Sequence, residues 1–250
     1  MNPVVVIPAR MAATRLPGKP LADIGGKPMI VRAWEQAMAA DVGPVVVAAG
    51  DPEIAEAVAA AGGTAVLTDP DLASGSDRVL AALAEVDPDW THDVVINLQG
   101  DMPFVEPDVI RALRDLFEDQ PALGMGTLVA PEASPADRTN PDVVKAILAL
   151  APGARQGRCL YFTRSTLYGD GPVWRHIGLY GYTRRALTQA YEAAPPTPLE
   201  KREKLEQLRA LELGVDIWAA VVDAPPLSVD SPADLEAARA FARASAGGGA

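Results

Sequence analysis

The feature that most constrains the fold is the alternation of short aliphatic runs with longer helical patterns through the first half of the chain. The aliphatic runs are continuous in hydrophobicity, which is typical of strands buried on both faces. They lie at Val4–Ile7, Val45–Ala49, Thr64–Thr68 and Val94–Leu98. Helix formers recur about every 3.6 residues between them, at Met29–Ala40, Pro52–Ala61 and Ser76–Val86. This alternation predicts an α/β fold with a doubly wound, mostly parallel sheet.

The second half of the chain has strand patterns with less helix between them, which favours a small mixed or antiparallel subregion at about 150–197. After a helix at Glu106–Gln120, strands are predicted at Gly126–Ala130, Val143–Leu148, Cys159–Thr163, Ile177–Tyr182 and Val215–Val222. A charged amphipathic helix is predicted at Thr197–Leu213. A last helix, with Ser231 as N-cap and Pro232 at its first position, is predicted to run to about Ala244. We expect one domain over residues 1–244 and a flexible tail at 245–250.

Composition and charge exclude several classes of protein. Hydrophobic residues make up 49% and charged residues 22% of the 250 residues, which argues against a disordered chain. The formal net charge of −11 disfavours a nucleic acid or an anionic membrane as a partner. No apolar run approaches the ~18 residues of a membrane span, and the start lacks the pattern of a secretory signal. The single cysteine, Cys159, cannot form an intrachain disulfide, so we expect a small buried apolar residue in a cytoplasmic protein.

The loop after the first strand carries three cations, Arg10, Arg15 and Lys19. It leaves the sheet at the carboxyl end of a buried strand, where open α/β sheets bind their ligands. Forked guanidinium groups and a lysine point charge suit a triphosphate. A solvated basic loop is the alternative interpretation. The positive charge is local in an acidic chain, which favours a compact polyanionic ligand over a polymer.

This loop does not match two common phosphate-binding motifs. A P-loop ending at Gly18-Lys19 needs Gly at position 13 and Ser or Thr at position 20, where the chain has Ala13 and Pro20. No G-x-G-x-x-G sequence follows the strand, which disfavours a dinucleotide cofactor.

Two carboxylates far apart in the chain form a candidate metal site. Asp101 follows the strand at Val94–Leu98, within Gln99-Gly100-Asp101, and Asp230 directly precedes Ser231. Each has an ordinary explanation, as a turn residue or as a favourable charge near a helix start. If they meet beside a triphosphate, they form a Mg²⁺ site for phosphoryl or nucleotidyl transfer, because Mg²⁺ takes one or two carboxylates together with phosphate oxygens and waters.

Two further patterns carry weaker signals. Ser74 and Arg78 are typical of a helix start that carries a cation, and a capping serine with a surface arginine is the simpler explanation. Along the strand at Ile177–Tyr182, period-two alternation places His176, Gly178 and Tyr180 on one side. That side suits a polyol pocket, and a satisfied core histidine is the competing explanation.

Several motifs together resemble a known enzyme family. Ile7-Pro8-Ala9-Arg10 and Thr14-Arg15-Leu16-Pro17-Gly18-Lys19-Pro20 resemble the opening of sugar nucleotidyltransferases. Later motifs narrow the resemblance to the 3-deoxy-manno-octulosonate cytidylyltransferases (CMP-Kdo synthetases), over residues 3 to about 240. These motifs are Gln99-Gly100-Asp101, His176-Ile177-Gly178-Leu179-Tyr180-Gly181-Tyr182, Pro198-Leu199-Glu200, Glu206-Gln207-Leu208-Arg209 and Val229-Asp230-Ser231-Pro232-Ala233-Asp234-Leu235. The resemblance implies a Rossmann-like sheet of the nucleotide-diphospho-sugar transferase type.

The resemblance also implies a reaction, in which CTP and the sugar acid Kdo give CMP-Kdo and pyrophosphate with Mg²⁺, for lipopolysaccharide biosynthesis. It implies a homodimer. It implies catalytic roles for Arg10, Lys19, Asp101 and Asp230, with the two aspartates as Mg²⁺ ligands. The implied CTP contacts are Pro8, Ala9, Arg10, Arg15, Lys19, Ser74, Arg78 and Gln99. The implied Kdo contacts are His176, Tyr180, Glu206 and Gln207.

Three other functions stay open at this point. The first is nucleotidyl transfer to another acid sugar, such as 8-amino-Kdo or a sialic acid, or to a sugar 1-phosphate. The second is glycosyl transfer on a similar sheet, which is disfavoured because Met102 and Pro103 follow Asp101 where an Asp-x-Asp metal motif is expected. The third is a nucleotide sensor without catalytic activity.

Overall fold

The computed structural model describes residues 1–12 and 15–247. Ala13 and Thr14 of the basic loop, and residues 248–250 of the predicted tail, lie outside the described residues. The chain divides into two compact units. The N-terminal unit comprises Pro3–Thr91, Asn97–Ile110 and Pro226–Ala250, and the central unit comprises Met1–Asn2, His92–Ile96 and Arg111–Pro225. Whether residues 1–244 form a single domain stays a prediction.

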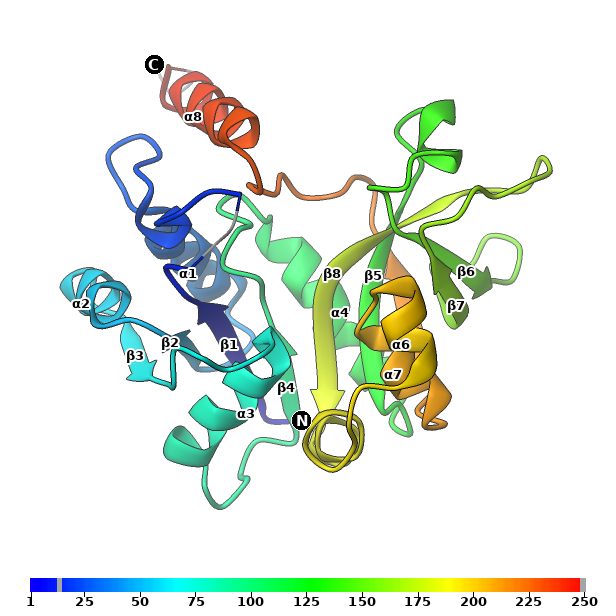
Figure 1. The fold of residues 1–250 in the computed structure, drawn as a ribbon, viewed down its shortest axis with the longest axis horizontal. Coiled ribbons are helices and arrows are strands. Elements are labelled where there is room, and N and C mark those ends of the chain that lie inside the picture. Colours follow the sequence, from blue (N-terminus) through cyan, green and yellow to red (C-terminus); the bar gives the residue numbers. More distant parts are fainter. Residues whose placement is uncertain (13–14, 248–250) are drawn as a thin grey trace. The chain divides into compact units, whose positions relative to one another are not determined.

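Three parallel strands run through the N-terminal unit in the order β3-β2-β1. They are β1 (Pro3–Ala9), β2 (Val45–Ala49) and β3 (Thr64–Leu67). The helices around them are α1 (Met29–Ala40), α2 (Pro52–Ala60) and α3 (Gly75–Val86), with a short 3-10 turn, η1 (Lys19–Leu21), after the basic loop (Figure 1). Because the strands are parallel, the loops that follow β1 and β2 meet at one edge of the sheet, where such folds bind ligands.

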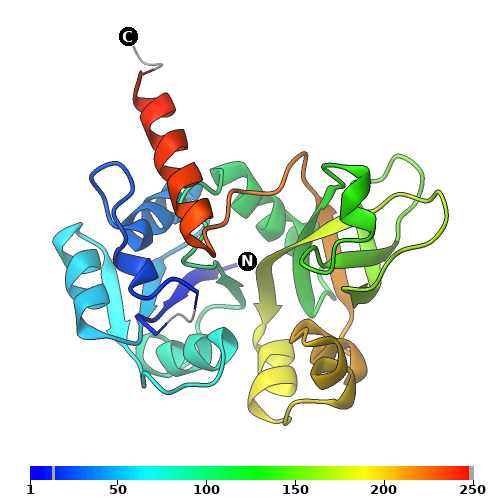
Figure 2. The ribbon, with the colours of Figure 1, turned by 45° about the horizontal axis from the view of Figure 1, so that its top comes forward.

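The last helix, α8 (Pro232–Gly247), belongs to the N-terminal unit, and Figure 2 shows it in red beside the blue N-terminal segment. It packs into a buried apolar cluster formed by Ile24, Met29, Val229, Leu235, Ala238 and Ala242. The predicted N-cap is confirmed, because the Asp234 amide donates to Ser231 Oγ at 3.3 Å and the Asp234 carboxylate accepts from the Ser231 amide at 2.8 Å. The cluster and the cap together fix the segment that carries Asp230.

The central unit contains a mixed sheet in the order β4-β8-β5-β9-β7-β6. Its strands are β4 (Val94–Asn97), β5 (Met125–Pro131), β6 (Lys145–Ala149), β7 (Gln156–Thr163), β8 (Trp174–Thr183) and β9 (Ile217–Val221). The last residue of β4, Asn97, is counted with the N-terminal unit. β5 runs parallel to β9, whereas β5 with β8, β6 with β7 and β8, and β7 with β9 pair antiparallel. The α/β class is therefore confirmed and the sheet is mixed. The antiparallel pairing extends beyond 150–197, because β5 and β9 take part in it.

The helices of the second half differ from the sequence prediction in two places. The central unit contains α4 (Pro107–Asp119) from Arg111 onward and the 3-10 turn η2 (Pro135–Arg138). It also contains α5 (Arg184–Leu187) and a π-helical turn, η3 (Thr188–Glu192), which the sequence did not predict. The single helix predicted at Thr197–Leu213 is wrong, because the segment forms α6 (Pro198–Glu203) and α7 (Gln207–Glu212).

The break between α6 and α7 has a local cause. Lys204 adopts a left-handed conformation with φ of 56°, which ends α6 and turns the chain. Arg209 of α7 then donates to both carboxylate oxygens of Glu200 in α6, each at 2.7 Å, and both side chains are largely buried. This bidentate ion pair and the burial of Leu205 hold the two short helices together.

Two expectations from composition can be compared with the fold. Cys159 is buried and free, and burial raises the pKa of its thiol to about 12, as expected of a small apolar residue. Within residues 1–12 and 15–247, no helix has the length and apolar content needed to cross a membrane.

Candidate active site

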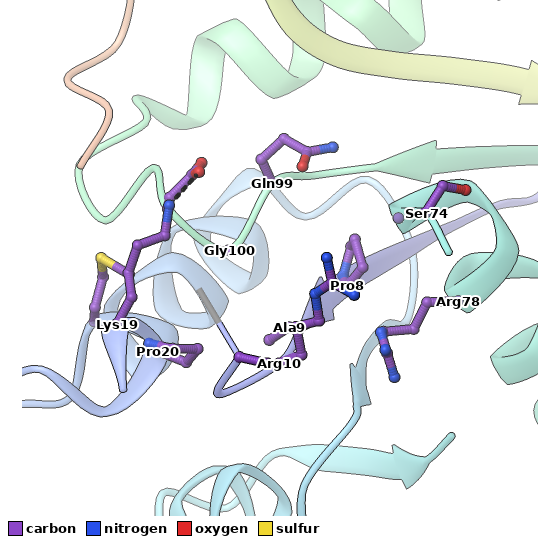
Figure 3. Close-up of a pocket in the computed structure, with 13 residues that line it drawn as sticks. Pro8, Ala9, Arg10, Lys19, Pro20, Ser74, Arg78, Gln99 and Gly100 are labelled. Atoms are coloured by element: carbon purple, nitrogen blue, oxygen red, sulfur yellow. Dashed lines mark hydrogen bonds and ion pairs between the residues drawn. The ribbon is translucent and has the colours of Figure 1, made fainter. Parts of the chain in front are cut away.

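A cavity of about 330 Å³ lies in the N-terminal unit at the carboxyl end of β1 (Figure 3). Its wall contains seven of the residues predicted to contact CTP, together with the predicted metal ligand Asp101. The seven are Pro8, Ala9, Arg10, Lys19, Ser74, Arg78 and Gln99. The structure therefore brings together residues from three separate segments of the chain in one pocket, and their contact with CTP stays a prediction.

Lys19 lies between the two predicted metal ligands. Its Nζ atom donates to Asp101 Oδ2 at 2.8 Å and to Asp230 Oδ1 at 3.1 Å. The two carboxylates are brought together by the backbone, because the Val229 amide donates to the Asp101 carbonyl at 2.9 Å while Val229 is wholly buried in the α8 cluster. Two acidic side chains more than half the chain apart thus converge on one point.

The charges of this cluster depend on one another. Burial lowers the pKa of Lys19, but the carboxylates of Asp101 and Asp230 outweigh it and raise that pKa above its usual value. Burial raises the pKa of Asp101, and the nearby Lys19 ammonium offsets only part of this rise. Lys19 therefore stays positively charged at neutral pH, and its ammonium group lies between the side chains of Asp101 and Asp230.

The carboxylate pair fits a divalent cation. Mg²⁺ takes one or two protein carboxylates and completes its shell with phosphate oxygens and waters, so Asp101 and Asp230 are a sufficient protein donor set beside a triphosphate. Among the described residues, no group of three or more His, Cys, Asp or Glu side chains is arranged to hold a metal ion.

The two arginines of the basic loop have different surroundings. Arg10 lines the cavity, and its guanidinium donates to the carbonyl of Leu72 at 3.2 Å. Arg15 is mostly exposed, with 70% of its side chain accessible, and its guanidinium lies 3.3 Å from Asp230 Oδ1. Arg10 therefore belongs to the cavity wall, whereas Arg15 lies on the exposed side of Asp230.

Ser74 and Arg78 organise the opposite wall of the cavity. Ser74 caps α3 in a reciprocal pair with Asp77, whose amide donates to Ser74 Oγ at 3.1 Å. Arg78 is almost wholly buried and donates to Thr68 Oγ1 at 2.5 Å and to the carbonyl of Asp69 at 3.0 Å. Both side chains line the cavity. The capping role of Ser74 is confirmed, whereas the alternative of a surface arginine is wrong, because Arg78 is buried and bonded to the segment at Thr68–Pro70.

The sequence analysis missed Asp51, which positions the basic loop. Its Oδ2 atom accepts from the Met11 amide at 2.7 Å. Asp51 comes directly after Gly50 at the end of β2, so the available signal was a carboxylate just beyond a buried strand at the ligand edge.

A second cavity, of about 300 Å³, lies in the central unit beside β8. His176, Tyr180 and Gln207, three of the four predicted Kdo contacts, line it, and Gly178 lies between the first two on the strand. Glu206, the fourth, is the residue before Gln207 and is close enough for its charge to act on Tyr180. Period-two alternation along β8 therefore predicted the face of the strand correctly.

Burial keeps two polar side chains of this second cavity, those of His176 and Tyr180, neutral. Burial, and then the charge of Arg164, lower the pKa of His176 to about 3. Burial, and then the neighbouring Tyr182 and Glu206, raise the pKa of Tyr180 well above its usual value. At neutral pH both groups are uncharged hydrogen-bonding groups, which suits sugar hydroxyls.

Two arginines that the sequence analysis did not select, Arg164 and Arg175, also line the second cavity. The fully buried Lys145 fixes the backbone at Arg164, because its ammonium donates to the main-chain carbonyls of Arg164 at 2.9 Å and Asn140 at 2.8 Å. Arg175 lies 3.5 Å from the Asp137 carboxylate. In the sequence, neither arginine differed from an ordinary surface cation. The two come together in one cavity wall only because β6 pairs with both β7 and β8.

Comparison with known proteins identifies the family. A family model described as cytidylyltransferase matches residues 4–217. A 3-deoxy-manno-octulosonate cytidylyltransferase from Parvibaculum lavamentivorans is 59% identical over 240 residues, which cover 96% of this chain and 92% of that protein. The chain belongs to the 3-deoxy-manno-octulosonate cytidylyltransferase family.

Two further comparisons agree with membership of this family. A 3-deoxy-manno-octulosonate cytidylyltransferase from Rhodospirillum centenum is 57% identical over 241 residues, 96% of this chain and 93% of that protein. A solved structure of CMP:2-keto-3-deoxy-manno-octonic acid synthetase complexed with CTP has a TM-score of 0.89 and 39% identity, and covers 98% of this chain and 100% of that one. The resemblance drawn from the motifs is therefore confirmed at the level of the family.

Proposed function

We propose that the chain catalyses the reaction of its family, the transfer of the cytidylyl group of CTP to the anomeric 2-hydroxyl of Kdo, which gives CMP-Kdo and pyrophosphate. The observation that carries this proposal is the convergence of Asp101 and Asp230 on Lys19, beside a cavity lined by Arg10. Such a cluster pairs a cation-binding carboxylate set with side chains that bind phosphates.

CTP binds in the cavity of the N-terminal unit. Arg10 and Lys19 hold its triphosphate, and Arg15 assists from the exposed side of the loop. The remaining lining residues, Pro8, Ala9, Ser74, Arg78 and Gln99, surround the cytosine and ribose. Attack is in line at the α-phosphorus, so negative charge grows on the departing pyrophosphate, where the side chains of Lys19 and Arg10 stabilise it.

Asp101 and Asp230 hold the Mg²⁺. Bound there, the ion supplies Lewis-acid polarisation of the oxygens that it contacts. A positive charge already occupies the position between the two carboxylates in the form of the Lys19 ammonium, so a divalent cation at this point requires Lys19 to turn toward the triphosphate. The lysine is long and flexible enough for this exchange.

Kdo binds in the cavity of the central unit. The neutral side chains of His176 and Tyr180, together with Gln207 and Glu206, contact its hydroxyls. The guanidinium groups of Arg164 and Arg175 suit its carboxylate, because arginine binds carboxylates in a forked geometry. We further propose that the protein acts as a homodimer in the cytoplasm, in keeping with its free, buried Cys159.

The test is mass spectrometry of a mixture of the protein, CTP, Kdo and Mg²⁺. We expect CMP-Kdo and an equal amount of pyrophosphate, with no product when Mg²⁺ is removed by a chelator. Parallel mixtures contain 8-amino-Kdo or a sialic acid. If a product forms only with one of these sugar acids, that sugar acid replaces Kdo as the proposed substrate. A rise in melting temperature with CTP, without product from any sugar acid, would instead indicate a nucleotide sensor.

A further inference from the structure

Strand β5 pairs antiparallel with β8, the strand that lines the second cavity (Figure 1). Thr127 lies on β5 and is wholly buried. Its Oγ1 atom is 3.0 Å from His176 Nε2, 3.2 Å from the Ile177 carbonyl oxygen and 3.0 Å from the Leu179 carbonyl oxygen. These three partners belong to the part of β8 that lines the second cavity.

The contacts coincide with an irregularity in the sheet. Thr127 pairs with Tyr180 and the next residue, Leu128, pairs with Ile177, so Gly178 and Leu179 form a bulge in β8. Bulges re-aim the side chains beside them. The Thr127 hydroxyl lies within hydrogen-bond distance of the carbonyls of Ile177 and Leu179, on either side of Gly178, and therefore contacts the bulge between His176 and Tyr180.

The hydrogen-bond inventory determines which nitrogen of His176 carries the proton. A hydroxyl has one proton to donate, and the two carbonyl oxygens only accept. If the Thr127 proton went to His176 Nε2, both buried carbonyls would face an oxygen without a proton, which is costly away from water. The low-energy arrangement sends the hydroxyl proton to a carbonyl and the Nε2 proton of His176 to the hydroxyl oxygen.

We infer that Thr127 is a positioning residue, which holds His176 as the Nε2–H tautomer so that Nδ1 is the acceptor offered to a hydroxyl of the sugar acid. Nδ1 makes no hydrogen bond to any residue in the described parts of the chain, and the ring lies in the wall of the cavity. The neighbouring Phe162, 4.9 Å from the imidazole between ring centres, supports the ring from one side. The role of Nδ1 depends on the proposed sugar site, whereas the tautomer is a property of the free protein.

The chain suits a direct test, because it contains only two histidines, His92 and His176. In a protein labelled with ¹⁵N-histidine, the ring nitrogens of His176 are assigned from a His92→Gln variant. We expect a protonated Nε2 and an unprotonated Nδ1 at neutral pH, without CTP or Kdo. A protonated Nδ1, or averaged nitrogen signals, would overturn the inference. This measurement needs no substitution at Thr127.

Substitution then tests the positioning role. Thr127→Val keeps the shape but removes the hydroxyl, so we expect averaged tautomers and a KM for Kdo raised on the order of tenfold, with the KM for CTP unchanged. Thr127→Ser restores the wild-type nitrogen signals and the KM for Kdo. The matched control is Thr139→Val, because Thr139 is an exposed threonine of the same unit whose hydroxyl bonds to the Ala136 carbonyl.

Other outcomes separate this inference from the proposed function. Unchanged nitrogen signals or an unchanged KM for Kdo in Thr127→Val would refute the positioning role. If the wild-type protein makes CMP-Kdo but His176 carries its proton on Nδ1, the inference fails and the proposed function stands. If the tautomer is as expected but no sugar acid is a substrate, the proposed function fails and the acceptor role of Nδ1 fails with it.

Discussion

In the N-terminal unit, Lys19 keeps its charge because two carboxylates face it, whereas in the central unit burial keeps His176 and Tyr180 neutral. The first cavity is built for a ligand whose charge is its main feature, and a triphosphate with a divalent cation is such a ligand. The second cavity combines the neutral side chains of His176 and Tyr180, which suit hydroxyl groups, with the guanidinium groups of Arg164 and Arg175, which suit a carboxylate. The difference predicts that changes of charge act most strongly in the first cavity, and changes of shape or hydrogen bonding in the second.

The largest effect is expected from the carboxylate pair. Asp101→Asn and Asp230→Asn each remove a proposed metal ligand, and we expect turnover to fall on the order of a thousandfold while CTP binding partly survives. The measurement is the rate of pyrophosphate release at saturating CTP and Kdo. Asp41→Asn is the matched control, because Asp41 is an exposed aspartate of the same unit with φ of 51°, which asparagine tolerates. Wild-type turnover in either site variant would reject the metal assignment.

The next effect concerns the lysine that faces the pair. Lys19→Ala removes a charge that we propose binds the triphosphate, so we expect CTP to bind on the order of a hundredfold more weakly and turnover to fall as well. Isothermal titration with CTP measures this loss. Lys27→Ala serves as the control, since Lys27 is half exposed and paired with Glu35. Equal CTP affinity in the Lys19 variant and the wild type would contradict the role given to the basic loop.

A smaller effect is expected from a change of shape in the central unit. A Cβ at Gly178 would meet no protein atom within 4 Å, so the space in front of it, between His176 and Tyr180, is open. Gly178→Ala fills that space, and we expect the KM for Kdo to rise on the order of tenfold while the melting temperature and the KM for CTP stay the same. Gly171→Ala, at an exposed glycine with equally open surroundings, is the control. An unaltered KM for Kdo would place the sugar elsewhere.

The smallest effect concerns stability and pH. The pKa of His176 is about 3 in the folded protein, below the ordinary value of 6.5, so between these values the unfolded chain binds a proton that the folded chain does not. Stability should therefore fall as the pH drops from 6.5 toward 3, with this residue contributing up to about 1.4 kcal/mol per pH unit. Urea unfolding from pH 7 to pH 4 measures the slope. We expect a shallower slope in His176→Gln, and an identical slope would show that His176 titrates normally.

The sequence predicted the first cavity better than the second, for physical reasons. The strand β1, the cations Arg10 and Lys19, and the carboxylate Asp101 follow one another in a parallel α/β pattern, whose ligand edge is known in advance. Only the meeting with Asp230 was a hypothesis, and it depends on burial of Val229 in the α8 cluster. The alternation of strands and helices thus determines the position of most residues in this site, because it places their loops at one edge of the sheet.

The second cavity depends on pairings that a single sequence does not specify. The alternation of His176 and Tyr180 was visible, but the contributions of Arg164 and Thr127 arise from antiparallel pairing of distant strands and from a bulge. The division of Thr197–Leu213 into two helices was likewise hidden, because helical periodicity continues through Lys204 while the ion pair between Arg209 and Glu200 folds the chain back.

The most direct test of the account is a crystal structure of the protein with CTP and Mn²⁺ in place of Mg²⁺, in which anomalous scattering marks the metal. We predict one Mn²⁺ with a carboxylate oxygen from both Asp101 and Asp230 in its shell, and Lys19 turned to the triphosphate. A bound Mn²⁺·CTP in which neither aspartate contacts the metal would contradict the account.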